Sequence, residues 1–215
     1  MTTLSDVWPI FGLTLRTPRL ELRPVLDQDI PAAVAAARSG IHEPGRNPFS
    51  TAWAESPEND LGRRMAQWHW RCRAECTPES WTLLLGIWHE DEFIGCQDLG
   101  AKDFSTLRMV STGSWLKQSA QGQGLGKEMR AAVALYAFDW LSAEIATSEA
   151  AIWNTASLGV SRSLGYELNG ITRQAWGGKA ETVQHVRLTQ DTFKRPDWEL
   201  KVEGHEPVAR FLKVT

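Results

Sequence analysis

The sequence contains few cysteines and no long apolar run. Its three cysteines, Cys72, Cys76 and Cys96, are odd in number and lack the paired spacing of a metal site, so we expect reduced thiols and no metal. No cationic start leads into an apolar run, and no apolar stretch approaches the roughly 20 residues of a membrane span. We therefore expect a cytoplasmic protein that is not secreted and has no membrane partner.

The chain also lacks an excess of positive charge. It carries 23 basic and 26 acidic side chains, a formal net charge of -3. Proteins that bind nucleic acids usually concentrate positive charge, so no nucleic-acid partner is expected. The 215 residues suit one domain, or one domain with a short appendage, and they can bury a core without disulfides.

Tryptophan, by contrast, is abundant. The 11 tryptophans are scattered from Trp8 to Trp198 without a fixed period, so no repeat architecture is indicated. An indole buries a large area and needs one hydrogen-bond partner, so we expect most of them to anchor the core and a few to wall a groove.

The first half of the chain predicts strands and helices in alternating blocks. Residues 13–25 form one strand, or two broken near Pro18, and helices follow over residues 30–38, capped by Asp27, and 59–75. The segment between these helices, rich in proline and glycine, is predicted to be a loop. A three-stranded antiparallel meander then covers residues 81–89, 92–99 and 108–116, with a loop over residues 100–106, because each connection is short.

The second half predicts a helix over residues 125–141, a strand over 144–152 and a helix from a cap at Asn154 to Leu164. An antiparallel pair, residues 166–173 and 182–188, closes the order. This order predicts an α+β fold, with a mixed, mostly antiparallel central sheet and helices on both faces.

We expect one domain over residues 1–195 and a C-terminal appendage over residues 196–215. The appendage contains Trp198, Val202 and Phe211, which are apolar enough to need covering. We therefore expect it to contact a second subunit in a homo-oligomer.

A glycine-rich turn opens the helix at residue 125. Alternate glycines let successive amides converge, and the first helical turn leaves its N–H groups unpaired, so the segment is suited to a phosphate or pyrophosphate. The predicted cofactor-binding residues of this turn are Gln121, Gly122, Gln123, Gly124, Leu125, Gly126 and Lys127.

Two other phosphate motifs do not fit this turn. A Walker loop needs glycine where Gln121 stands and a hydroxyl where Glu128 stands. The dinucleotide fingerprint needs a different glycine spacing in a parallel sheet. A nucleotide-binding module stays an alternative, with ATP or NAD protecting the protein from heat and CoA having no effect.

The turn and the order of elements resemble the GNAT superfamily of N-acyltransferases. The family's motif, Arg/Gln-x-x-Gly-x-Gly/Ala, is matched at Gln121, Gly124 and Gly126. The likeness covers most of the chain and is closest to actinobacterial members of the ribosomal-protein N-acetyltransferase (Rim) branch. It is carried by residues 17–24 (TPRLELRP), 93–95 (FIG), 113–116 (GSWL), 154–157 (NTAS) and 164–166 (LGY).

The resemblance implies direct attack of an amine on the thioester of acetyl-CoA or succinyl-CoA. The carbonyl oxygen and the pantetheine amides would meet the backbone of Ser114, Trp115 and Leu116, where that strand leaves its neighbour. Asn154 would bind pantetheine or order a water, and Ser157 would protonate the leaving thiolate. Asn154 and Ser157 also suit a plain helix start without catalysis.

Two positions depart from the family pattern. Ser161 stands where many members have the tyrosine that protonates the thiolate, and Ser111 stands where relatives have a carboxylate base. The base is left open between a water chain and three carboxylates, those of Asp98, Asp103 and Glu149.

The acceptor could be a protein N-terminus, a lysine or a small amine. His42 is a candidate for recognition, and His69 is expected to pack. Three arginines, Arg46, Arg108 and Arg173, are candidates for the carboxylate of a succinyl group. The alternative function is a non-catalytic acyl-CoA-binding sensor or scaffold.

Overall fold

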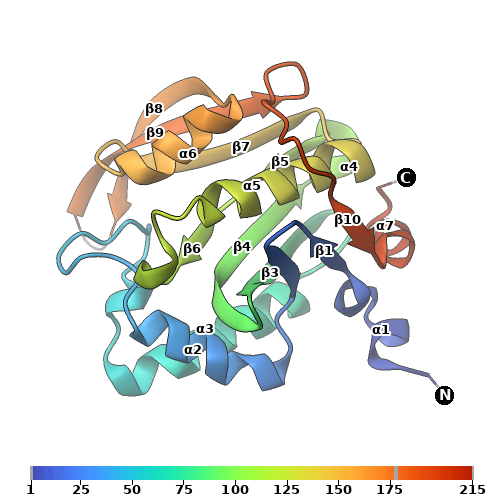
Figure 1. Ribbon diagram of the computed structural model, residues 1–215, viewed down its shortest axis with the longest axis horizontal. Coiled ribbons are helices and arrows are strands. Elements are labelled where there is room, and N and C mark those ends of the chain that lie inside the picture. Colours follow the sequence, from blue (N-terminus) through green and yellow to red (C-terminus); the bar gives the residue numbers. More distant parts are fainter. Residues whose placement is uncertain (1, 177–178, 215) are drawn as a thin grey trace.

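One mixed sheet organises the computed structural model, which describes residues 2–176 and 179–214 (Figure 1). Its strand order is β10-β1-β2-β3-β4-β5-β7-β9-β8, and β6 pairs with β4 beside β5. The strands are β1 Thr14–Arg16, β2 Leu20–Pro24, β3 Ser80–His89, β4 Glu92–Lys102, β5 Met109–Ser111, β6 Ser114–Leu116, β7 Ile145–Ala151, β8 Glu167–Trp176, β9 Lys179–Thr189 and β10 Lys201–Glu203.

Every described strand pair is antiparallel except β5 with β7. That parallel pair joins the strand before the glycine turn to the strand after it. The predicted α+β fold is thus confirmed. The helices are α1 Leu4–Val7, α2 Ile30–Arg38, α3 Glu58–Ala74, α4 Phe104–Leu107, α5 Leu125–Leu135, α6 Thr155–Leu164 and α7 His205–Leu212.

Helices cover both faces of the sheet, because residues alternate between two cores along β3 and β4. Leu83, Leu85 and Ile87 pack with the apolar side of α5, whereas Phe93 and Cys96 pack with α2 and α3. This alternation follows from the two-residue period of a strand. In Figure 1, α5 crosses in front of β4, and α2 and α3 lie below.

Several predicted bounds were wrong. The strand predicted over residues 108–116 is divided into β5 and β6. The predicted loop over residues 100–106 instead holds the end of β4, which continues to Lys102, and the beginning of α4. The helix that begins at Leu125 widens after Leu135 into a π-helical turn, Tyr136–Trp140, where Leu141 N donates to Tyr136 O. Asp27 lies in a 3₁₀ turn, and the Asp29 carboxylate accepts the Leu26 N–H instead.

The C-terminal appendage packs on this chain's own core. β10 pairs with β1, and Val208, Ala209 and Leu212 of α7 are buried in the cluster that includes Leu13 and Leu15. Trp8 meets Phe211 edge to face, with ring centroids 5.2 Å apart. The apolar residues of the appendage are therefore largely covered without a second subunit.

No helix in the described ranges combines the length and the apolar character that a membrane crossing requires.

Candidate active site at the parting of two strands

The sheet opens between β6 and β7. Thr112 is the last residue that joins them: its N–H donates to Thr147 O at 2.9 Å, and Ser148 Oγ donates to its carbonyl at 2.9 Å. Beyond Thr112, the described pairings of β6 are with β4, while β7 pairs with β9. The predicted separation of the Ser114–Leu116 strand from its neighbour is confirmed.

The opening exposes backbone amides of β6. Asp98 N donates to Gly113 O, and Lys117 N donates to Ile94 O, both at 2.8 Å. These bonds on either side of β6 show that the odd-numbered positions of this stretch are the ones that bond to β4. Bonding directions alternate along an antiparallel strand. The N–H groups of Ser114 and Leu116 therefore point toward the opening, where β6 has no described pairing with β7.

The glycine turn at the start of α5 has a backbone conformation that suits glycine. Gly122 (φ 75°) and Gly124 (φ 79°) occupy the left-handed region that favours glycine. Within the described chain, no acceptor bonds to the backbone N–H groups of residues 122–126. Lys127 is exposed beside them. The turn is thus an open cradle of amides at the positive end of a helix dipole.

The side chains of the turn hold the loop itself. Gln121 Nε2 donates to Leu116 O at 2.9 Å and to Ile41 O at 2.7 Å, which ties the turn to β6 and to the loop before α3. Gln123 Nε2 donates to Ser119 O at 2.7 Å. These two side chains stabilise the cradle, and the amides line it.

A buried carboxylate anchors the helix start to β2. Glu128 accepts from Thr17 Oγ1 at 2.6 Å and from Arg19 Nε at 2.6 Å, and Arg19 Nη1 donates to Gln123 O at 3.1 Å. The sequence motif at residues 17–24 therefore helps to hold the start of α5 and the glycine turn in place. Residue spacing alone could not reveal it, because the partners lie more than 100 positions apart.

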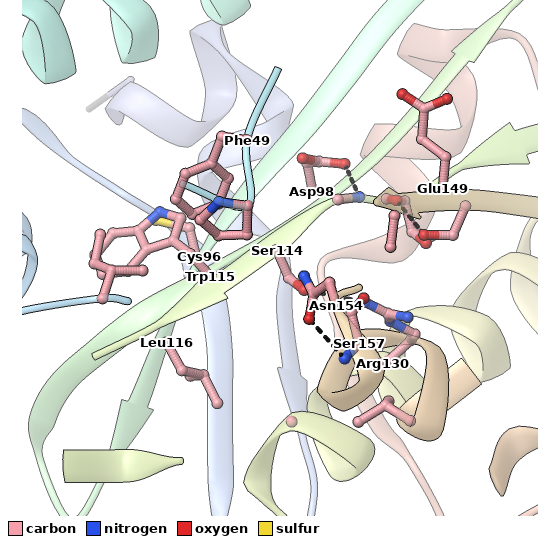
Figure 2. Close-up of a pocket in the computed structure, with 18 of the residues that line it drawn as sticks. Phe49, Cys96, Asp98, Ser114, Trp115, Leu116, Arg130, Glu149, Asn154 and Ser157 are labelled. Atoms are coloured by element: carbon pink, nitrogen blue, oxygen red, sulfur yellow. Dashed lines mark hydrogen bonds between the residues drawn. The ribbon is translucent and has the colours of Figure 1, made fainter. Parts of the chain in front are cut away.

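One cavity of about 1590 Å³ joins the cradle to the strand opening. Figure 2 shows its middle: Ser114, Asn154, Ser157 and Arg130 gather at one side, with Asp98 and Glu149 farther along the sheet. Its walls include, among the predicted site residues, Ser114, Trp115, Leu116, Gln121, Gly122, Gly124, Gly126, Lys127, Asn154 and Ser157.

Asn154 caps α6 as predicted. Its Oδ1 accepts the Ser157 N–H at 3.1 Å, which leaves the carboxamide Nδ2 without a partner in the described chain. Ser157 is half-buried, lines the cavity and has no described partner for its hydroxyl. The cap and a role toward a ligand are therefore compatible.

Arg130, which sequence reasoning missed, places a buried guanidinium in this wall. It is 4% exposed, and its Nη1 donates to Ser161 Oγ at 2.8 Å and its Nη2 to Ser114 Oγ at 3.3 Å. Burial lowers the pKa of Arg130. The signal was available: arginine at position 130 interrupts the apolar face of α5 next to Met129.

Asp98 is the carboxylate that the structure brings to the opening. It lies on β4 at the gap between β5 and β6, half-buried in the cavity wall, and its Oδ1 accepts the Gly113 N–H at 2.6 Å. Burial raises the pKa of Asp98 to about 7, against the lowering effects of the Gly113 N–H and of Arg130.

The other two carboxylate candidates differ in position. Glu149 on β7 lines the cavity and is exposed, with Gln174 Nε2 at 3.2 Å and His185 Nδ1 at 3.3 Å from its Oε2. Asp103 precedes α4 at its N-cap position, outside the cavity lining. Ser111 lines the cavity and donates its hydroxyl to Gly100 O at 3.4 Å.

Some of the histidine and arginine candidates line the cavity and others do not. His42, His69 and Arg46 line it, and Arg108 and Arg173 lie outside its lining. His69 packs as expected: it is buried, and burial lowers its pKa to about 4.

Aromatic rings form the wall opposite Arg130. Phe49, from the proline-rich loop, packs against Trp53, and Trp53 packs against Trp115 of β6. The rings are tilted, with centroid separations of 5.0 Å and 5.7 Å. The loop thereby reaches the strand that carries the open amides. The side chain of Trp115 belongs to this wall, whereas its backbone belongs to the pairing with β4.

Cys72, Cys76 and Cys96 are buried free thiols. Across the described residues, no cluster of three or more His, Cys, Asp or Glu side chains could hold a metal ion.

A mixed sheet that opens beyond one parallel pair, beside a glycine-rich helix start, defines an N-acyltransferase fold. The acetyltransferase (GNAT) domain family matches residues 19–167, which is more than half of the chain. The chain therefore belongs to the GNAT acetyltransferases, a family that transfers an acyl group from acyl-CoA.

Solved structures share this fold. RimJ of Mycobacterium smegmatis, in complex with a CoA disulfide, has a TM-score of 0.70 at 17% identity, covering 94% of this chain and 95% of that one. RimL, a ribosomal-protein alpha-N acetyltransferase in complex with coenzyme A, has a TM-score of 0.64 at 18% identity, covering 82% of this chain and 97% of that one. A ribosomal-protein-serine acetyltransferase from Vibrio cholerae has a TM-score of 0.62 at 18% identity, covering 82% of this chain and 97% of that one. These folds agree with the predicted Rim-like branch.

Proposed function

We propose that this protein transfers an acyl group from acyl-CoA to a primary amine, with the donor's pyrophosphate bound by the amides between Gln121 and Lys127. The observation that carries the proposal is the continuity of one cavity from that cradle to the open amides of Ser114 and Leu116. A phosphate is favoured at the cradle by unpaired N–H groups and by the helix dipole. The pantetheine amides would pair with β6 as an added strand does.

The thioester carbonyl would lie at the β6 edge. An open N–H in the stretch Ser114 to Leu116 would stabilise the negative charge that forms on the carbonyl oxygen during attack. Asn154 Nδ2 would bind pantetheine or a water, and the Ser157 hydroxyl would pass a proton to the departing sulfur. Both lie on the α6 side of the same cavity.

Asp98 is our candidate for the base. The amine arrives mostly as ammonium and must lose a proton before it attacks. A carboxyl group with a pKa of about 7 is ionised in part at neutral pH and is a better proton acceptor than an ordinary carboxylate. Its bond to Gly113 N–H leaves the second oxygen, Oδ2, for the amine or an intervening water.

We propose acetyl-CoA as the donor, with succinyl-CoA as the alternative. A succinyl carboxylate needs a cation at the acyl end of the cavity. Of the three arginines considered for that purpose, Arg46 is the one that lines the cavity. A thermal-shift comparison of acetyl-CoA, succinyl-CoA and free CoA tests the choice, since a succinyl preference would require such a cation.

For the acceptor we propose a primary amine of a protein N-terminus, a lysine or a small molecule. The acceptor would enter between the aromatic wall of Phe49 and Trp53 and the polar group of Glu149 and His185. The exposed carboxylate would attract an ammonium group. A panel of N-terminal peptides, lysine peptides and small amines would rank the three acceptor types.

A non-catalytic acyl-CoA sensor is the second candidate. It is favoured by the hydroxyls at Ser111 and Ser161, where many family members carry a carboxylate and a tyrosine. Turnover of radiolabelled acyl-CoA with the amine panel separates the two, since binding without transfer would identify the sensor.

The cradle is tested by a matched pair of substitutions at Gly122. An added Cβ meets no atom within 4 Å there, and both Asp and Asn tolerate the left-handed conformation. Gly122→Asp should weaken CoA binding by about tenfold or more, because a carboxylate would oppose the diphosphate, whereas Gly122→Asn should bind far better. Calorimetry that finds equal affinities for the two variants would exclude this phosphate site.

Self-association and a cytoplasmic location are also proposed. The appendage no longer supports a dimer, but the edge strand β8 exposes Leu168 and Ile171, at 75% and 63%. Exposed apolar residues on a sheet edge are typical of association surfaces. Light scattering would detect a monomer if this prediction is wrong.

The proposed cytoplasmic location is supported by the buried, unpaired thiols, which agree with a reducing compartment.

A further inference from the structure

Arg130 carries a buried charge for which the described chain supplies no ion pair. Its two Nη atoms bond to the neutral hydroxyls of Ser161 and Ser114, and its Nε has no partner among the described residues. The facing titratable groups are Asp98 of β4 and Tyr166, which follows α6. Oδ1 of Asp98 is already bonded to Gly113 N–H.

Such a cation is costly to keep. Burying an ionised group without an opposite charge opposes folding, and an apolar side chain of similar volume is often at least as stable. The arginine also lines the cavity, between the open edge of β6 and the start of α6. A negative ligand group arriving there would find a fixed, desolvated positive charge.

We propose that Arg130 binds the sulfur of the acyl donor and stabilises the thiolate that leaves during transfer. The inference rests on the proposed function, which places the thioester carbonyl at the β6 edge beside Ser114. The sulfur is bonded to that carbonyl carbon, so it must lie in the same part of the cavity. Arg130 is held next to this part of the cavity, because its guanidinium bonds to Ser114 on β6 and to Ser161 on α6.

The step balances without a proton from Arg130. The amine nitrogen forms a bond to the carbonyl carbon, the C–S bond breaks, and the sulfur leaves with that electron pair as thiolate. The ammonium first loses one proton to Asp98 or to water, and the nitrogen loses its second proton to water once it is bonded to the carbonyl carbon. Arginine stays protonated and supplies N–H donors and charge, and the thiolate gains its proton later through Ser157 or solvent.

Asp98 strengthens this arrangement as the reaction proceeds. Before it accepts a proton from the ammonium, its carboxylate partly offsets the charge of Arg130. Once it has accepted the amine proton it is neutral, and the guanidinium then faces the new thiolate alone. The two groups would thus act in sequence, one on the nucleophile and one on the leaving group.

The test measures the thiol of bound CoA by its thiolate ultraviolet absorbance. In the wild-type protein we expect the thiolate fraction near pH 7 to exceed that of free CoA, whose thiol has a pKa of about 8.5, by about tenfold. Arg130→Met should abolish this gain, and Arg130→Lys should retain part of it. With Arg130→Met, kcat should fall about 100-fold, and equally for acetyl-CoA and succinyl-CoA.

Ser161→Ala is the second variant, because it removes one bond to the guanidinium and keeps the charge. It should lower the thiolate fraction in the same direction but by less. Binding of CoA below pH 6, where the thiol is protonated, should be equal in wild type and Arg130→Met, which controls for folding.

Three results would overturn the proposal. An unchanged thiolate fraction in Arg130→Met would remove Arg130 from the sulfur. A loss confined to succinyl-CoA would assign it to the acyl carboxylate instead. No binding of CoA to the wild-type protein would overturn the proposed function first, and this inference with it.

Discussion

Asp98 and Gly113 bond to each other twice across the gap that divides β5 from β6. Asp98 N donates to Gly113 O at 2.8 Å, and Gly113 N donates to Asp98 Oδ1 at 2.6 Å. The reciprocal pair holds a carboxyl group at the point where the sheet opens, within the wall of the cavity. It positions our candidate base beside the edge amides.

The pH dependence of the reaction should report Asp98. Burial raises its pKa to about 7, so the carboxyl is protonated and inactive as a base below pH 7. With a saturating amine acceptor, kcat should therefore rise through pH 7 and level above it. Asp98→Asn should abolish this rise of kcat with pH and should lower kcat about 100-fold.

The control is Glu149→Gln, which removes the other carboxylate in the cavity. It should change the KM for the amine and leave the midpoint near pH 7 in place. If Glu149→Gln moved the midpoint and Asp98→Asn did not, the base would be Glu149.

Gly113→Ala should displace the Asp98 carboxyl. A Cβ at residue 113 would lie 2.7 Å from Asp98 Oδ2, closer than real contacts allow, so the side chain must turn away. We expect kcat to fall about tenfold with little change in CoA binding, because displacing a base impairs proton transfer.

Gly159→Ala on α6 is the matched control, since a Cβ there meets nothing within 4 Å. It should keep full activity and stabilise the protein by about 0.5–1 kcal/mol, as alanine favours helices. Equal kinetics for Gly113→Ala and wild type would show that the carboxyl position is unimportant.

Arg130→Met should make the protein more stable while making it a poorer enzyme. Removing a buried charge without an ion pair is expected to gain about 1 kcal/mol, which raises the Tm of a chain of this size by about 2–4 °C. Calorimetric unfolding of the ligand-free protein measures it. A lower Tm would mean that the hydroxyls of Ser114 and Ser161, together with Asp98, already compensate the guanidinium.

Glu128→Gln should destabilise the start of α5. The carboxylate is 7% exposed and accepts bonds from Thr17 and Arg19, and the amide NH₂ of glutamine would face those donors. We expect a loss of about 1–3 kcal/mol in the free energy of unfolding. The exposed Glu149→Gln should stay within about 0.5 kcal/mol of wild type in the same urea titration.

Local features were readable from the sequence because neighbouring residues decide them. The alternation of Leu15, Leu20 and Leu22 predicted one strand, or two broken near Pro18, and the structure has two. Asn154 with Gly165 predicted both ends of α6. The alternate glycines of residues 122–126 likewise predicted converging amides, and the structure adds that Gly122 and Gly124 are left-handed. In each case the backbone preference belongs to a few consecutive residues.

Tertiary contacts decided what spacing could not reveal. The break between β5 and β6 depends on how Thr112 and Gly113 bond to β7 and β4, and the appendage found its partner in β1, far earlier in the chain. The unusual character of Asp98 and Arg130 comes from desolvation by elements distant in sequence. The sequence determined the local conformations and the amide cradle, whereas burial and long-range pairing, which exist only in the folded chain, decided where charge stands in the cavity.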